Sequence, residues 1–206
     1  MPTLLHIDSS PRSASVSSRL AATFVTKWLQ GHPDSIVIHR NTSRERIPYL
    51  DEATIEAFCT PAAALSLAQK QAVASSDKLV DELLAADVVV LAAPMWNLSI
   101  PASLKAWIDL IVREGRTFAF TPQGVAPLMP PGKRVFVFTA RGGAYPLGSP
   151  FHALDYQEPY LRLILGIIGL TQIEFIHAEH QRESPELAAA GLARAEEDLA
   201  TQMVDS

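Results

Sequence analysis

The segment DVVVLAAPMWN at residues 87–97 most constrains what this chain can fold into. It begins as an apolar, β-branched run without alternation, which predicts a strand buried on both faces. Pro94 cannot donate to a sheet ladder and so predicts the end of the strand. A loop of Met95, Trp96 and Asn97 follows, and then a helical pattern over residues 100–114. In an open α/β sheet, a flat ligand binds outside the carboxyl ends of such strands.

Strand and helix patterns alternate along the whole chain. Strands are predicted over residues 3–8, 34–40, 87–94, 133–139 and 171–177, and helices over 19–30, 52–58, 66–86, 100–114, 160–169 and 184–204. Residues 115–121 resemble a short strand or hairpin arm, and the Pro- and Gly-rich residues 122–132 are expected to be a loop. Five β-α units predict one parallel sheet covered by helices, in a single domain over residues 1–206. The strand order 2-1-3-4-5 would bring the loops after strands one, three and four to one edge.

Composition and charge exclude several classes of function. The net charge of −5 gives no electrostatic reason to expect nucleic acid or an anionic membrane as a partner. A single cysteine, Cys59, excludes an internal disulfide and fits a reducing compartment. The start of the chain lacks a signal-peptide pattern, and the longest apolar runs, 88–95 and 163–170, are too short to span a membrane. We therefore expect a cytoplasmic location.

Residues 9–18 contain six serines between the first strand and the first helix. The N-terminus of a helix offers unpaired N–H groups and a positive dipole end, and serine hydroxyls add neutral donors. Arg12 adds charge, so the loop suits a phosphate. The alternative is that Ser15, Ser17 or Ser18 only caps the helix. The loop has no glycine and no G-x-G-x-x-G pattern, which favours a monophosphate over a dinucleotide.

Three further segments bear on a site. Ala140, Arg141, Gly142 and Gly143 follow the fourth strand, where glycine lets the backbone approach a ligand and two N–H groups can bind an anionic ring edge. The irregular, aromatic residues 144–158 are expected to be functional or to lie at an interface. The helix over 160–169 is apolar almost all round, so it is buried in the monomer or against a second copy. The isolated sequence HAEH at 177–180 is not expected to bind a metal.

Taken together, these residues resemble a known family. Its matching motifs are Ser9-Ser10 with Ser15-Val16-Ser17, IPYLD at 47–51, APMWN at 93–97, Leu104-Lys105 with Asp109, Gly115-x-Thr117-Phe118, Arg141-Gly142-Gly143, and PYL at 159–161 with Gly166-x-x-Gly169. The chain is similar to the FMN-dependent NADH-azoreductases, which are also NAD(P)H:quinone oxidoreductases. The resemblance implies a flavodoxin-like α/β fold with a doubly wound five-stranded parallel sheet, order 2-1-3-4-5, and helices on both faces.

The resemblance also implies that FMN is the cofactor. Its phosphate would be held by Ser10, Ser15, Val16 and Ser17, and its ring by Met95, Trp96, Asn97, Leu98, Ala140, Arg141, Gly142 and Gly143. The family usually has Tyr where this chain has Trp96, and Ser where it has Ala140. Its members are homodimers with the flavin at the interface, where Phe120 would supply a partner aromatic to the substrate. Ile167 stands where some relatives carry Phe.

The implied mechanism is ping-pong. NADH or NADPH reduces the flavin and leaves, and a quinone or azo compound then takes the same place and receives the electrons. Because the cofactor carries the redox chemistry, no catalytic acid or nucleophile is required from the protein. Asn97 would hydrogen-bond near N5 or O4, and the N–H groups of Gly142 and Gly143 would stabilise charge at N1 and O2.

Alternative functions remain at this point. A hydrolase is disfavoured because the G-x-S-x-G elbow is absent. A flavodoxin-like FMN electron carrier without nicotinamide-dependent activity would share the fold and the flavin. The aromatic residues in 118–120 and 145–156 favour a substrate pocket over an exposed flavin edge. A structural domain without flavin is the third alternative.

Overall fold

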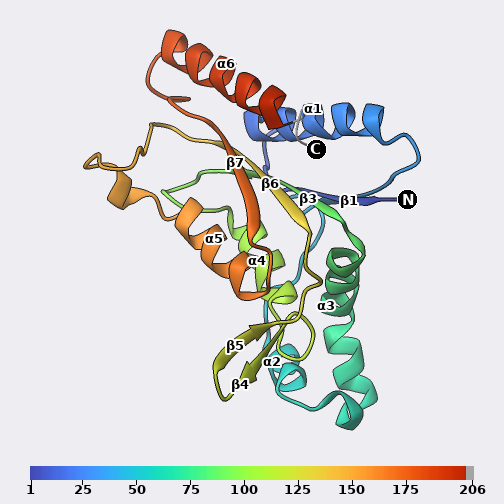
Figure 1. Cartoon of the computed structure of the whole chain (residues 1–206). Coiled ribbons are helices and arrows are strands. Elements are labelled where there is room, and N and C mark those ends of the chain that lie inside the picture. Colours follow the sequence, from blue (N-terminus) through green and yellow to red (C-terminus); the bar gives the residue numbers. More distant parts are fainter. Residues whose placement is uncertain (203–206) are drawn as a thin grey trace.

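The computed structural model describes residues 1–202 and is built around one parallel sheet (Figure 1). Its strands, in spatial order, are β2 Ile36–Asn41, β1 Thr3–Asp8, β3 Val88–Pro94, β6 Arg134–Ala140 and β7 Gln172–Ala178. Every neighbouring pair is parallel. The predicted order 2-1-3-4-5 is therefore confirmed, because β4 and β5 lie outside this sheet.

The helices pack on this sheet through two separate hydrophobic clusters. The helices are α1 Val16–Gly31, α2 Glu52–Phe58, α3 Leu67–Ala85, α4 Ala102–Ile111, α5 Glu158–Ile167 and α6 Pro185–Gln202, with 3₁₀ turns at Ala62–Ala64 and His152–Leu154. Val89 and Leu91 of β3 belong to the cluster that contains side chains of α3, α4 and α5. Val90 and Ala92 belong to the cluster that contains side chains of α1 and α6. This alternation follows from the two-residue period of a strand.

Several helix boundaries differ from the sequence-based prediction. The first helix begins at Val16 and not at residue 19, because the Ser15 hydroxyl accepts a hydrogen bond from the Ser18 N–H at 3.2 Å and caps it there. The helix expected over 100–114 is shorter, since Pro101 precedes its first turn and Ile111 ends it. The helix expected over 160–169 spans Glu158–Ile167. Of the last predicted helix, residues 203 and 204 lie outside the described part of the chain.

The loop expected over residues 122–132 is wrong in part. It contains β5 Gly124–Pro127, which pairs antiparallel with β4 Phe118–Thr121 in a two-stranded hairpin. Gly124, at φ 118°, opens β5 and Pro127 closes it, so both occupy strand ends, where they are tolerated. Gly124 and Pro127 are two of the six proline and glycine residues that gave the segment its loop-like composition.

The sheet positions its functional edge through β3. Every residue of β3 is buried, and its neighbours in the sheet are β1 and β6. Since all three strands are parallel, the loops that follow them leave the sheet at one edge. No helix within residues 1–202 has both the length and the apolar character needed to cross a membrane.

Candidate active site

The loops that follow β1, β3 and β6 surround a cavity of about 850 Å³, and residues after β7 complete its lining. The sequence-predicted residues among its lining are Ser10, Ser15, Val16, Met95, Trp96, Asn97, Leu98, Ala140, Arg141 and Gly142. They come from three chain segments that are distant in sequence. The volume lies within the range usual for small-molecule and cofactor sites.

Three predicted site residues do not line this cavity. Ser17 is fully buried, and its hydroxyl lies 3.1 Å from that of Ser15. Gly143 adjoins the lining, and its carbonyl accepts a hydrogen bond from the His180 N–H at 3.4 Å. Phe120 lies on β4 and is 66% exposed. Phe120 is not among the residues that line the cavity.

One end of the cavity is built for an anion. The first N–H groups of the sixteen-residue helix α1 have no partner within the helix, and its dipole is positive at this end. The Ser10 N–H donates to Asp8 at 3.0 Å, and the Ser10 hydroxyl accepts from the Arg12 N–H at 3.3 Å. These bonds fix the serine loop. Capping by Ser15 and a role for the loop in anion binding are therefore compatible.

The loop after β3 is a tight turn with strained backbone. The Trp96 N–H donates to the Ser99 carbonyl at 2.9 Å, and the Ser99 N–H donates back at 3.1 Å. Asn97 and Leu98 between them have φ values of 49° and 69°. The left-handed conformation costs a residue such as Leu98 roughly 1–2 kcal/mol. Strain of this kind accumulates at functional sites, where the surrounding structure maintains it.

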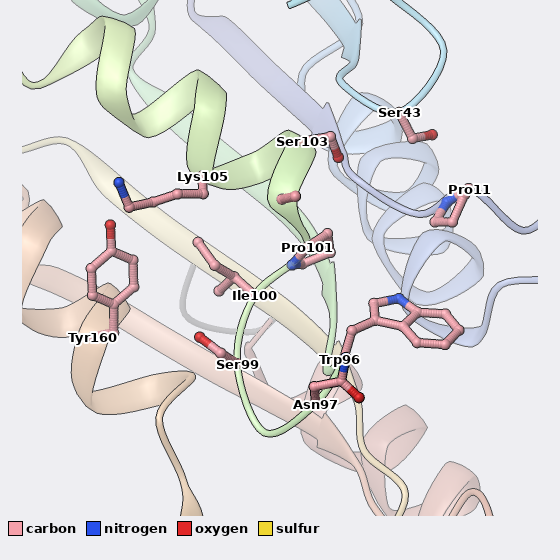
Figure 2. Close-up of a pocket in the computed structure, with 11 residues that line it drawn as sticks. Pro11, Ser43, Trp96, Asn97, Ser99, Ile100, Pro101, Ser103, Lys105 and Tyr160 are labelled. Carbon is pink, nitrogen blue, oxygen red and sulfur yellow. The ribbon is translucent and has the colours of Figure 1, made fainter. Parts of the chain in front are cut away.

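A second pocket of about 820 Å³ shares Trp96 and Asn97 with the first (Figure 2). Trp96 and Pro11 lie at one end of it, and Lys105 and Tyr160 lie at the other (Figure 2). Burial raises the pKa of Tyr160 to about 12, and Asp109 adds to the rise, so its hydroxyl stays protonated at neutral pH. Trp96 is 39% exposed between the two spaces. A flat molecule in either space would therefore meet its indole.

The sequence did not reveal Gln181 and Arg182, which also line the main cavity. Tyr145 lines it too, and it belongs to the aromatic segment 144–158, which the sequence predicts to be functional or to lie at an interface. The Gln181 N–H donates to the Arg141 carbonyl at 2.9 Å, and the Arg182 N–H donates to the Gly142 carbonyl at 3.1 Å. Backbone pairing thus holds the segment after β7 beside the loop after β6. The rule that parallel strands end at one edge was the available signal, since β7 also ends there.

Charge in the cavity is positive. Among the described residues that line it, three are arginines and none is acidic. Arg141 is ion-paired with Asp155 at 3.0 Å, whereas Arg12 and Arg182 have no ion pair within residues 1–202. An arginine-lined cavity with a helix N-terminus at one end and an aromatic and two turns at the other fits FMN, an anionic mononucleotide with a flat ring. Gly142 leaves room there, since an added Cβ would meet only the side chain of Arg182, at 3.6 Å or more.

The HAEH residues are committed to other contacts. His177 lies between the Thr139 hydroxyl at 2.8 Å and Glu158 at 2.9 Å, and His180 contacts Glu183 at 2.8 Å. Among the described residues, no three His, Cys, Asp or Glu side chains are grouped as a metal site.

Comparison with known proteins gives a consistent result. Residues 2–203 match the family model described as flavodoxin-like fold. A protein of Nostoc sp. named FMN-dependent NADH:quinone oxidoreductase is 44% identical over 201 residues, which cover 97% of each chain. A protein of Azotobacter vinelandii with the same name is 47% identical over 97% of this chain and 98% of its own.

Solved structures agree with these relatives. The crystal structure of an azoreductase from Bacillus anthracis str. Sterne is 30% identical, covers 97% of this chain and 99% of its own, and superposes with a TM-score of 0.85. An FMN-dependent NADH-azoreductase from Bacillus anthracis str. Ames Ancestor, solved in complex with FMN, has a TM-score of 0.86 over 98% of this chain and 100% of its own. At 21% identity, this second likeness shows the fold.

Proposed function

The chain belongs to the flavodoxin-like family of FMN-dependent NADH:quinone oxidoreductases and azoreductases, and we propose that it passes electrons from NADH or NADPH to quinones and azo compounds by a ping-pong mechanism. The observation that carries the proposal is the convergence of three strand-end loops on one arginine-lined cavity. With a net charge of −5, small molecules and not nucleic acids are the proposed partners.

FMN, when bound, supplies the redox chemistry by accepting hydride from the nicotinamide and passing the electrons on. Ser10, Ser15 and the first N–H groups of α1 would hold its phosphate, beside Arg12. Because the Ser17 side chain is buried, Ser17 would contribute its backbone N–H. Met95–Leu98 and Ala140–Gly143 would hold the ring.

The chain's own role in the chemistry is binding and electrostatic stabilisation. The N–H groups of Gly142 and Gly143 would donate toward the pyrimidine edge of the ring, where negative charge increases on reduction. Asn97 is held in a tight turn at φ 49°, and its amide would hydrogen-bond near N5 or O4 of the flavin. Trp96 provides an aromatic plane, and no side chain is assigned as a catalytic acid, base or nucleophile.

Anaerobic addition of NADH to the FMN-loaded protein tests this function. We expect the flavin absorbance to bleach within the time of mixing and to return when a quinone or azo compound is added. If NADH leaves the absorbance unchanged while dithionite bleaches it, the protein is an FMN electron carrier and the oxidoreductase proposal fails. A preparation that takes up no FMN would support the structural domain instead.

We also propose a homodimer in which Phe120 of one protomer reaches the substrate of the other. Phe120, Val125 and Leu128 are exposed on or beside the hairpin, and such patches mark interaction surfaces. Light scattering should give a dimer for the wild type and a monomer for Phe120→Asp. Leu187→Asp, which places the same charge at an exposed apolar residue of α6, should remain dimeric. A monomeric wild type would contradict the proposal.

Two finer features belong to the same proposal. The doubly wound arrangement, with helices on both faces, is supported by the two hydrophobic clusters, which contain different helices (Figure 1). A cytoplasmic location is supported by the single, exposed and unpaired cysteine, Cys59.

A further inference from the structure

Three polar side chains are buried together behind the loop that follows β6. Arg141 is 2% exposed, Asp155 is 7% exposed and Gln157 is fully buried. The Arg141 guanidinium is 3.0 Å from Asp155 Oδ2, and its Nε donates to Gln157 Oε1 at 3.2 Å. Groups of this kind are rarely buried so completely, and their burial requires hydrogen-bond or ion-pair partners.

These contacts join two walls of the cavity. Arg141 itself lies in the cavity wall. The Gln157 amide nitrogen donates at 3.0 Å to the carbonyl of Ala93, two residues before Met95. The Met95 N–H in turn donates to the Ala140 carbonyl at 3.0 Å. The segment that holds Asp155 and Gln157 therefore fixes the loops after β3 and β6 relative to each other.

Asp155 is the main counter-ion of Arg141. Its other oxygen, Oδ1, accepts the N–H groups of Gln157 at 2.9 Å and Glu158 at 3.1 Å, at the start of α5. Glu158 is farther away, at 3.6 Å from Arg141 Nη2, and is held by His177 and Arg162. Among the described residues, Nη2 has no hydrogen-bond partner. The charge at this wall is thus set by how far Asp155 offsets Arg141.

A buried ion pair is a poor way to gain stability, because desolvation cancels much of its attraction and an apolar group of the same shape often performs as well. A buried ion pair differs from an apolar group in two ways: it fixes the geometry of the groups that it joins, and it carries charge. Both act here on the wall that would face the flavin ring.

We propose that Arg141, Asp155 and Gln157 are positioning residues that align the two ring-binding loops, and that the Arg141–Asp155 pair sets the reduction potential of the bound flavin. This inference rests on the proposed function. Reduction adds negative charge to the ring, so a more positive wall favours the reduced form and a more negative wall favours the oxidised form.

The test is to measure FMN affinity and two-electron potential in three variants. Asp155→Asn keeps the two hydrogen bonds to Oδ1 and removes the main counter-ion of Arg141, leaving only Glu158 at 3.6 Å, so the potential should rise. Arg141→Met leaves Asp155 uncompensated, so it should fall. In each variant we expect the ratio of the dissociation constants of oxidised and reduced FMN to change at least tenfold. For two electrons, this change corresponds to a shift of about 30 mV in the potential. Gln157→Met should weaken FMN binding at least tenfold, measured by flavin fluorescence, with the potential unchanged.

Controls come from an ion pair outside the cavity in which the arginine is buried and the aspartate is partly exposed. Arg113 is also buried, and it lies 2.6 Å from Asp77, outside the cavity lining. Arg113→Met and Asp77→Asn should lower the melting temperature without moving the potential. If Arg141→Met does not fold, Arg141→Lys replaces it. Lysine keeps the positive charge but lacks the planar guanidinium, so this variant should bind FMN more weakly and have a potential near that of the wild type.

Each outcome separates the two proposals. Potentials that shift in opposite directions for Asp155→Asn and Arg141→Met support the inference. Shifts of the same sign, or shifts no larger than those of the Arg113 and Asp77 variants, overturn it while the oxidoreductase function stands. A wild type that binds FMN but is not reduced by NADH overturns the proposed function and leaves the potentials to decide the inference. A wild type that binds no FMN overturns both.

Discussion

At the scale of single residues, the arginines of the cavity divide by their partners. Arg141 is neutralised within the protein, whereas Arg12 and Arg182 have no ion pair among residues 1–202. The two arginines lie in segments that follow β1 and β7. A cation in a concave wall attracts an anionic ligand, and salt screens this attraction.

Reversing the charge of Arg182 tests its contribution. We expect Arg182→Glu to raise the dissociation constant of FMN about tenfold at low salt and by less at 0.5 M salt, since repulsion replaces attraction. Flavin fluorescence during titration of the apoprotein measures this. Arg194→Glu, on the exposed side of α6, is the control. An equal loss of affinity in the control would assign the effect to net charge alone.

Gly143 allows the role of a backbone N–H to be isolated. Gly143→Pro removes the donor, whereas Gly143→Ala keeps it and brings the added Cβ to 3.2 Å from the flexible carboxylate of Glu183. We expect FMN affinity to fall about tenfold for the proline variant, because about 1.4 kcal/mol is lost with one hydrogen bond to a charged group. For the alanine variant we expect a loss of less than about threefold, because the N–H is kept. Equal FMN affinities of the two variants would show that the Gly143 N–H does not bind FMN.

At the scale of elements, α6 fixes the last wall of the cavity. Gly191 of α6 faces the chain just after β7, and a Cβ added there would lie 2.2 Å from the Glu179 carbonyl oxygen. No side chain fits at this separation. The close contact holds the segment that leads to Gln181 and Arg182.

Gly191→Ala should therefore reverse the usual effect of this substitution in a helix. Alanine normally stabilises a helix by about 1 kcal/mol over glycine, but here the clash should destabilise the fold by about 1–3 kcal/mol. FMN affinity should fall with it. Thermal unfolding and fluorescence titration measure the two effects, with Gly31→Ala as control, because nothing lies within 4 Å of its Cβ position. A stabilised Gly191→Ala protein would show that α6 moves freely against this segment.

The regular elements were largely predictable from sequence. β1 at Thr3–Asp8 and α2 at Glu52–Phe58 match the predicted ranges, because local sequence determines both. β1 is a short apolar run, and Asp51, the residue before α2, caps that helix. β5 was missed because its pairing partner, β4, and not its own composition makes it a strand. Helix starts moved where a single hydrogen bond decides them, as at Ser15.

The candidate site was predictable as far as it follows strand ends. The loops after β1, β3 and β6 contain recognisable sequence motifs, and residues of all three loops line one cavity. Gln181 and Arg182 carry no motif and are placed by backbone hydrogen bonds to Arg141 and Gly142. The burial of Asp155 and Gln157 depends on long-range packing that no local pattern encodes.

At the scale of the whole molecule, acid should weaken the fold through His6 of β1. Burial lowers the pKa of His6 to about 4, repulsion from His39 adds to this, and Asp8 opposes it. Between pH 6.5 and pH 4 the unfolded chain binds a proton that the folded protein does not, so stability falls as pH falls. The loss should approach on the order of 3 kcal/mol at pH 4.

Urea unfolding at several pH values measures this loss. His6→Phe should flatten the dependence between pH 6.5 and pH 4. His39→Gln should keep most of it, because burial and not the neighbouring imidazole is the larger cause. An unchanged slope in His6→Phe would assign acid sensitivity to other groups.

Glu158 should contribute a second step at lower pH. Its hydrogen bond with His177 lowers the pKa of the carboxyl to about 2, with help from Arg162 and against desolvation. The stabilisation is complete above about pH 4.5 and is lost as pH falls toward 2. Glu158→Gln should remove the part of the slope below pH 4.5, which the same titration detects. If the stability of Glu158→Gln depends on pH below 4.5 as that of the wild type does, the Glu158 carboxylate is not the cause of this acid sensitivity.

The edge position of β7 has a consequence for biosynthesis. The walls of the cavity begin near residue 10 and end with Gln181 and Arg182, and β7 must dock on β6 before those two residues reach their places. Translation must therefore pass residue 182 before the nascent chain can enclose the complete cavity. A chain that ends before this residue would lack the wall formed by Gln181 and Arg182, and we expect it to bind the cofactor more weakly than the longer chain.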